Sequence, residues 1–292
     1  MIDLHMHSRY SDGSDTPAQI LQNAQKIGLS LLSITDHNRV GAYDDLADPS
    51  VRSLFDGKII KGCEFTTVFH GEIIEILGYG FKIPPVAEFL RPYIKTREQE
   101  QQETFDTTMR KYKSIGVHLE INEGDFDPST MFARPFIYQN MTQFEENKRF
   151  FVDEVDFTRY DRFIRNESYN VDSPLFIDAL SGLPAYGDIV RTIHAAGGKA
   201  FIAHLYVYPE KINAHPETLL EQVSPDGFEC YYSKFTPEQT KTLRAFCRKN
   251  DLLISGGSDY HGSRRPEVNL GIGCGDLCVN EEDVMQWVKN YL

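Results

Sequence analysis

Short β-rich segments alternate with amphipathic helical segments along the first and last parts of the chain. The first part predicts strands at 2–7, 31–35, 58–67 and 73–79, and a helix that begins at Pro17 and ends at Gly28. After Asp188 the alternation resumes, with strands at 200–204, 227–232 and 252–255 and helices at 189–196, 216–223, 237–250 and 281–292. This rhythm is typical of an α/β fold built from strand and helix units.

The middle of the chain has a different pattern. Between Pro84 and Tyr186 the segments are polar and rich in aromatic residues, and helices are predicted at 86–115 and 132–144. We expect these aromatic side chains to form a small core of their own. The sequence thus predicts an α/β part at 1–83 and 187–292 and a helical insertion or cap at 84–186.

Histidines and carboxylates gather where the predicted strands end. Five of the nine histidines stand there, namely His5, His7, His37, His204 and His261, and the nearby carboxylates are Asp12, Asp36, Glu64 and Asp259. The loops at these strand ends converge on one mouth in α/β folds. Each motif alone is weak evidence, but so many buried ionisable groups would be costly without a partner. Imidazole and carboxylate ligands without a thiolate suit Zn, Mn or Fe.

Composition and charge limit the class of partner. The 292 residues include 30 Lys and Arg and 43 Asp and Glu, for a formal net charge of −13. Such a surface disfavours long nucleic acid but leaves room for a small anionic substrate at a local positive site. The five scattered cysteines fit reduced thiols, and neither a signal peptide nor a membrane span is evident. We therefore expect a cytoplasmic protein whose oligomeric state the sequence does not specify.

The motifs together resemble a known family. In order they are Asp3-Leu4-His5-Met6-His7-Ser8, Ile34-Thr35-Asp36-His37, Gly62-Cys63-Glu64, Ile76-Leu77-Gly78-Tyr79, Ala203-His204 and Gly257-Ser258-Asp259-Tyr260-His261-Gly262. They resemble the PHP (polymerase and histidinol phosphatase) superfamily of metal-dependent phosphoesterases. The arrangement is most similar to the branch that hydrolyses nucleotide phosphates, such as nucleoside 3′,5′-bisphosphates or the 5′ ends of short RNAs. The resemblance implies a distorted seven-stranded (β/α) barrel with a helical insertion and two or three divalent metal ions.

The resemblance also implies which residues bind the metals. His5, His7, Glu64 and Asp259 would hold the first ion, and Glu64 would bridge to a second ion that His204 also binds. A third ion would take Asp12, His37 and His261 as ligands.

Glu75 departs from the family pattern, which usually has a histidine before the ILGY segment. A carboxylate can still bind a metal, and as a harder ligand it would shift preference toward Mn, Fe or Mg. The alternative is that Glu75 points away and leaves the second site weak or empty.

From these residues we predict a hydrolase, a phosphoric monoester phosphatase that acts on a small nucleotide-like substrate through metal-activated water. Asp259, His261 or water would protonate the leaving oxygen. The alternatives are a 5′ exonuclease on short RNA, a histidinol- or sugar-phosphate phosphatase, a hydrolase of C–N or ester bonds, and a catalytically silent metal-binding module. No membrane partner is expected.

Three residues are predicted to contact the substrate. Arg134 is the first, because the segment 134–138 keeps the arginine of the family's R-P-H-I-A motif and loses its histidine. A guanidinium binds phosphate oxygens in a forked geometry. Arg264, next to Arg265 after the last histidine motif, and Tyr10, in the loop before Asp12, are the other two.

Overall fold

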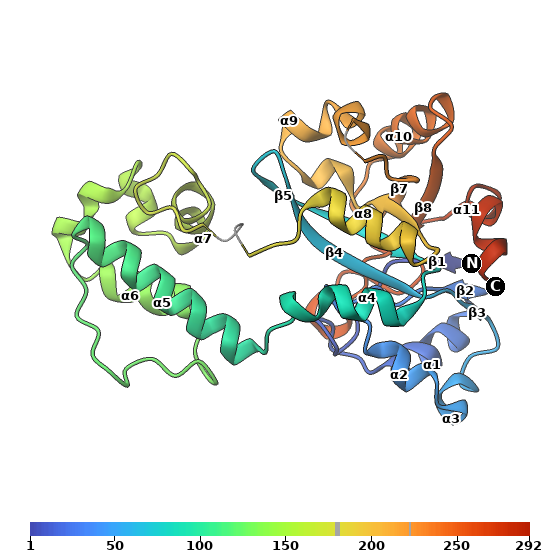
Figure 1. The fold of residues 1–292 in the computed structure, drawn as a ribbon, viewed down its shortest axis with the longest axis horizontal. Helices are drawn as coiled ribbons and strands as arrows, with labels where there is room; N and C mark the ends of the chain where they lie inside the picture. The colour runs from blue at the N-terminus through green and yellow to red at the C-terminus, as the bar shows by residue number, and fades with distance from the viewer. Residues whose placement is uncertain (179–181, 222) are drawn as a thin grey trace. The chain divides into compact units, whose positions relative to one another are not determined.

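The computed structural model describes residues 1–178, 182–221 and 223–292. The chain forms two compact units, one made of residues 1–94 and 183–292 and the other of residues 95–182 (Figure 1). The expected histidine and carboxylate motifs all lie in the first unit. No helix in the described ranges combines the length and apolar character needed to cross a membrane.

Within the described part of the first unit, eight strands in two sheets form the framework. The smaller sheet contains β1 (Ile2–Asp3), β2 (Leu31–Leu32) and β3 (Lys58–Ile59), all parallel. The larger sheet has the order β4 (Gly62–Phe69), β5 (Glu72–Tyr79), β6 (Lys199–Ile202), β7 (Gly227–Tyr232) and β8 (Leu253–Gly257). Strand β5 is antiparallel to both of its neighbours, whereas β6, β7 and β8 are parallel.

The two sheets meet edge to edge without closing into the seven-stranded barrel that the resemblance implies. Isolated parallel bridges connect them, one between His37 and Glu64 and one between Met6 and Tyr260. Both bridges lie at residues of the expected metal site or directly beside them. The α/β class is confirmed, and the residues that the structure describes form eight strands in two sheets with bridged edges.

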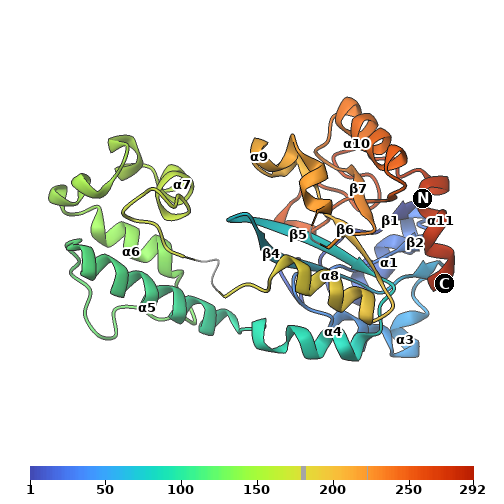
Figure 2. The ribbon, with the colours of Figure 1, turned by 45° about the horizontal axis from the view of Figure 1, so that its top comes forward.

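Helices cover the sheets of the first unit. These are α1 (Pro17–Ile27), α2 (Ala42–Leu46), α3 (Pro49–Arg52), α4 (Ile83–Leu90), α8 (Tyr186–Ala195), α9 (Glu210–Asn213), α10 (Pro237–Lys249) and α11 (Glu281–Val288). Figure 2 shows α4 and α8 running along β4 and β5. The main core is aromatic at its centre, where the Trp287 ring lies 4.7 Å from that of Phe201 and 5.4 Å from that of Tyr79.

Local sequence signals explain where α1 begins and ends. The Thr16 hydroxyl accepts a hydrogen bond from the Gln19 amide, and the Gln19 side chain accepts one from the Thr16 amide. Pro17 occupies the first turn, and Gly28 ends the helix at φ 75°. The predicted helix is therefore confirmed at both ends.

Other boundaries differ from the expectation. The strand predicted at 58–67 is two strands, because the chain leaves the small sheet after Ile59 and enters the large sheet at Gly62. The strand predicted at 2–7 keeps ladder pairing only at Ile2–Asp3. The helix predicted at 216–223 is a short 3₁₀ turn, Pro216–Leu220.

The second unit is helical, with a core of its own. It contains α5 (Arg97–Ile115), α6 (Ala133–Met141) and α7 (Tyr160–Phe163), followed by a π-helical turn at Ile164–Ser168. Its buried residues include Tyr112, Ile137, Met141 and Phe163. Helix α4, by contrast, buries Val86 and Leu90 in the core of the first unit.

Candidate metal centre

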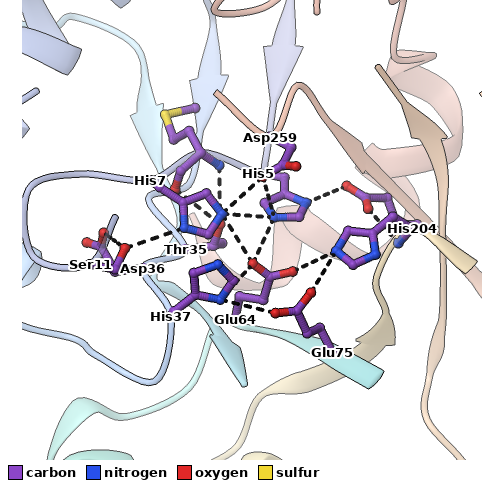
Figure 3. A network of polar contacts seen from close by, with 12 residues as sticks. His5, His7, Ser11, Thr35, Asp36, His37, Glu64, Glu75, His204 and Asp259 are labelled. Carbon is purple, nitrogen blue, oxygen red and sulfur yellow. Dashed lines mark hydrogen bonds and ion pairs between the residues drawn. The ribbon is translucent and has the colours of Figure 1, made fainter. Parts of the chain in front are cut away.

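The side chains of five chain segments converge on Glu64 (Figure 3). His5 and His7 follow β1, His37 follows β2, and Glu64 and Glu75 lie on the antiparallel strands β4 and β5. His204 follows β6, and Asp259 and His261 follow β8. Since β1, β2, β6 and β8 belong to parallel pairs, their carboxyl ends deliver the histidines to one place.

The first ligand group contains His5, His7, Glu64 and Asp259. Glu64 Oε2 lies 3.2 Å from Nε2 of both His5 and His7, and these two nitrogens are themselves 3.2 Å apart. Asp259 Oδ1 lies 3.2 Å from His7 Nε2 and 3.6 Å from His5 Nε2. Two imidazole nitrogens and two carboxylate oxygens therefore surround one point.

The second group lies on the other side of Glu64. His204 Nε2 lies 3.0 Å from Glu64 Oε1 and 3.1 Å from Glu75 Oε2. Glu75 Oε1 lies 3.3 Å from His37 Nδ1. Glu75 therefore points into the cluster, and the alternative that it points away is wrong.

The third group contains Asp12, His37 and His261, together with the second nitrogen of His7. Asp12 Oδ2 lies 3.1 Å from His261 Nε2 and 3.8 Å from His37 Nε2, and Asp12 Oδ1 lies 3.4 Å from His7 Nδ1. His7 and His37 each face two groups with their two nitrogens. The structure thus brings together all nine of the expected ligand residues.

The donor set fits a cluster of divalent metal ions. Three sets of side chains each place their donor atoms within 4.8 Å of one another and could hold a metal ion, namely His7, Asp12, His37 and His261, then His5, His7 and Glu64, and then His37, Glu64 and Glu75. Asp12 Oδ1, His37 Nδ1 and His204 Nδ1 are buried and lack a hydrogen-bond partner among the described residues. Buried polar atoms without hydrogen bonds and imidazole nitrogens turned toward one another are costly in the protein alone, and cations between them would remove that cost.

The histidines and carboxylates of the cluster shift one another's pKa values. Burial lowers the pKa of His7, but the hydrogen bonds to Asp259 and Glu64 outweigh it and raise the pKa to about 9. Burial also lowers the pKa of His204, but its hydrogen bonds to Glu64 and Glu75 outweigh burial and raise the pKa to about 10. Burial raises the pKa of Asp259, yet His5 and His7 hold it well below its usual range. Glu64 likewise has a lowered pKa despite its burial, because His5 and His37 face it.

Backbone geometry at the site departs from regular structure. His204 and Asp259 have φ values of 23° and 58°, in the left-handed region that side chains other than glycine rarely adopt. Gly256 and Gly257 both belong to β8. Gly257 is needed for close approach, since a Cβ there would lie 2.2 Å from the His5 amide nitrogen.

Sequence reasoning missed Glu229. Its Oε1 lies 2.8 Å from His5 Nδ1, and its Oε2 accepts a hydrogen bond from the His204 amide at 2.8 Å. A carboxylate on Nδ1 leaves Nε2 free to bind a metal. One signal could have revealed it: Glu229 is a charged residue in the middle of β7, a strand buried over its whole length.

Two further buried carboxylates support the loops of the site. Asp36 accepts hydrogen bonds from the Ser8 amide and from the hydroxyls of Ser8 and Ser11, each at 2.7 Å. Asp3 accepts hydrogen bonds from the Ser258 amide and hydroxyl. Asp36 thus holds the loop after β1, and Asp3 holds the loop after β8.

The three expected substrate contacts are in different environments. Tyr10 donates a hydrogen bond to Asp45 at 2.8 Å, and Arg264 is exposed beside the half-buried Arg265. Arg134 lies in the second unit, where its guanidinium stacks over the Tyr169 ring at 4.6 Å. It borders a cavity of about 380 Å³ that Phe132 and Tyr160 also line, and its Nε is buried without a hydrogen-bond partner among the described residues.

Comparison with known proteins relates the first part of the chain to one family. Residues 3–115 match the PHP domain family. Over 281 residues the chain is 26% identical to the 5′-3′ exoribonuclease Rnm of Escherichia coli (strain K12), covering 92% of this chain and 87% of that protein. Over 269 residues it is 25% identical to the 3′,5′-nucleoside bisphosphate phosphatase of Chromobacterium violaceum, covering 89% and 87%.

A solved structure supports the fold. A Bifidobacterium adolescentis protein classed as a metal-dependent phosphoesterase superimposes with a TM-score of 0.64 and 19% identity, covering 100% of this chain and 96% of that chain. At this identity the likeness concerns the fold alone.

Proposed function

Because this chain is a PHP-domain protein of the metal-dependent phosphoesterase type, we propose that it hydrolyses a small, nucleotide-like phosphate monoester. The observation that carries the proposal is that two of the three histidine and carboxylate groups share the buried carboxylate of Glu64, and that the third adjoins them through His7 and His37. Divalent ions bound there would activate water and neutralise the charge that develops on the phosphoryl group.

The metal-binding assignments follow from this geometry. We propose His5, His7, Glu64 and Asp259 for the first ion, and Glu64, Glu75, His204 and His37 Nδ1 for the second. Asp12, His261, His37 Nε2 and His7 Nδ1 surround the position of the third. A neutral imidazole binds one ion at a time, so His37 serves the second or the third.

The residues around the site favour water as the nucleophile. Cys63 adjoins Glu64, but burial raises the pKa of its thiol well above the ordinary value, so it stays protonated. The hydroxyls of Ser8 and Ser11 are directed to Asp36.

Asp259 and His261 are the proposed catalytic pair. Asp259 is ionised and cannot donate a proton. His261 Nε2 would protonate the leaving oxygen only when it does not hold the third ion, and otherwise water would do so. The His261 Nδ1 lies 2.8 Å from the Asp259 carbonyl oxygen, to which it donates, and this contact fixes the ring.

We further propose that Arg134, in the helical unit of residues 95–182, is a phosphate contact. Its guanidinium is held over Tyr169 in a geometry that leaves a cavity beside it, and aromatic side chains there offer a stacking surface for a base. Arg264 and Tyr10 are the proposed contacts in the first unit.

The relative from Escherichia coli favours a second function, 5′ exonuclease activity on short RNA. The two functions release different products. A phosphatase liberates inorganic phosphate from a nucleoside 3′,5′-bisphosphate, whereas an exonuclease liberates 5′ mononucleotides from a 5′-phosphorylated oligonucleotide.

The test uses Mn²⁺-loaded protein with both substrates, and with histidinol phosphate, a sugar phosphate and an aryl phosphate as further arms. We expect the fastest turnover on the bisphosphate. We also expect Asp259→Asn to lower kcat by about a hundred- to a thousandfold, as for removal of a group that stabilises transition-state charge. Arg134→Gln should raise KM, while Arg110→Gln, elsewhere in the same unit, should not. Mononucleotide release from RNA at a higher rate would favour the exonuclease, and inactivity on every substrate would leave the silent metal-binding module.

A further inference from the structure

Two side chains hold the outer oxygen of Asp259. The Tyr232 hydroxyl donates a hydrogen bond to Oδ2 at 2.9 Å, and Arg265 Nη1 donates to the same oxygen at 2.6 Å. The inner oxygen, Oδ1, faces Nε2 of His5 and His7. The two oxygens of one carboxylate therefore have separate surroundings.

This division restricts how Asp259 can bind a metal. With Oδ2 bound to a phenol and a guanidinium, Oδ1 is the oxygen left for the cluster. A carboxylate that binds through one oxygen occupies one coordination position, whereas one that binds through two occupies two and leaves less room for water. The orientation of Asp259 thus sets how many positions stay open.

From these contacts we infer that Arg265 and Tyr232 are positioning residues that make Asp259 a one-oxygen metal ligand. The inference rests on the proposed function and assigns a role to residues outside the nine ligands. Arg265 forms an ion pair with Asp259 and so places a positive charge beside this carboxylate. Its charge also offsets the repulsion between Asp259 and Glu64, whose carboxylates face the same two histidines.

Both residues come from neighbouring segments that the fold brings together. Tyr232 is the last residue of β7, and its ring lies 5.2 Å from the ring of His204. Arg265 follows the short 3₁₀ turn Gly262–Arg264 that begins directly after His261. Tyr232 therefore touches a proposed ligand of the first ion through its hydroxyl and a proposed ligand of the second through its ring.

The experiment measures metal binding without substrate. Metal-free wild type, Arg265→Gln, Tyr232→Phe and Arg264→Gln are titrated with Mn²⁺, and free Mn²⁺ is followed by electron paramagnetic resonance. We expect Arg265→Gln and Tyr232→Phe to weaken the tightest site about tenfold, the lower end of the range for residues that orient metal ligands. Arg264→Gln, an exposed neighbour, should bind as wild type does.

A spectroscopic measurement separates positioning from a general structural role. The Co²⁺-loaded Arg265→Gln variant should show altered visible absorption, because Asp259 is then free to bind through both oxygens. Arg265→Lys keeps the positive charge but lacks the forked hydrogen-bond donors of a guanidinium. It should therefore bind Mn²⁺ more tightly than Arg265→Gln and less tightly than wild type.

Distinct results would overturn the inference. If Arg265→Gln keeps wild-type metal affinity and the Co²⁺ spectrum but raises KM, Arg265 contacts the substrate instead. If the wild-type protein binds no metal, both the proposed function and the role of Arg265 and Tyr232 are wrong. Should Arg265→Gln not fold, Tyr232→Phe, which keeps the aromatic ring, decides the question.

Discussion

His5 Nδ1 lies 2.8 Å from Glu229 Oε1, which joins the first motif of the chain to a residue 224 positions further along. Both side chains are fully buried. The contact orients the imidazole so that Nε2 meets Glu64 and His7 at 3.2 Å. A single carboxylate on β7 thus sets the direction of a proposed ligand that follows β1.

We therefore expect Glu229→Gln to weaken metal binding by about ten- to a hundredfold, because an amide is a poorer acceptor for the Nδ1 proton and lowers the basicity of Nε2. Isothermal titration with Mn²⁺ measures the effect. Glu217→Gln, an exposed position, is the control. Equal affinities of Glu229→Gln and wild type would show that His5 needs no partner.

The carboxylate of Glu75 should bias the cluster toward harder ions. Glu75→His replaces an oxygen donor beside His37 and His204 with a nitrogen donor, so we expect the bound ratio of Zn²⁺ to Mn²⁺ to rise several-fold. The protein is loaded from an equimolar mixture and analysed by mass spectrometry of the metals. Glu72→His, on the same strand, should leave the ratio unchanged. A wild-type ratio in Glu75→His would mean that Glu75 does not select the metal.

Metal binding should stabilise the fold. Ligand binding to the native state raises the free energy of unfolding by about 2.7 kcal/mol at a hundred times Kd. We expect chelation to lower Tm by several degrees and added Mn²⁺ to restore it. In Asp259→Asn the shift should shrink, whereas the exposed Asp172→Asn should behave as wild type. A Tm independent of metal in wild type would contradict a bound cluster.

A buried carboxylate away from the cluster stabilises the α11 helix. Asp283 accepts a hydrogen bond from the Tyr231 hydroxyl at 2.6 Å and pairs with Arg244 and Arg248 at 2.7 and 3.0 Å. Burial raises the pKa of Asp283, but these partners lower it below the ordinary value. Its stabilising contribution is therefore present above the unfolded pKa and is lost as pH falls through the folded one.

We expect Asp283→Asn to lower the free energy of unfolding by about 2 kcal/mol at pH 7, a value typical for a hydrogen bond to a charged group. The difference from wild type should shrink as the pH is lowered below about 4, where the unfolded carboxyl is protonated. Urea unfolding at several pH values measures it, with the exposed Glu282→Gln as control. A difference that stays constant down to pH 2 would exclude the charge as its cause.

Much of the fold was readable because it depends on local chemistry. The capping of α1 by Thr16 and its end at Gly28 follow from backbone hydrogen bonds that neighbouring residues satisfy. The turn at His70-Gly71, between β4 and β5, also depends on local chemistry, since both residues adopt positive φ values. Strand length was harder to predict, because pairing with another strand, as at the exit from β3, ends or extends a strand.

The sequence by itself determined which residue types occupy the strand ends, since parallel strands deliver their carboxyl ends to one place whatever the details of packing. Only the tertiary structure decided the direction of Glu75, the contacts of Arg265 and Tyr232 with Asp259, and the partnership of His5 with Glu229. These depend on distances between segments far apart in the chain. No local pattern encodes such distances, because they arise from how the two sheets pack and bridge at their edges.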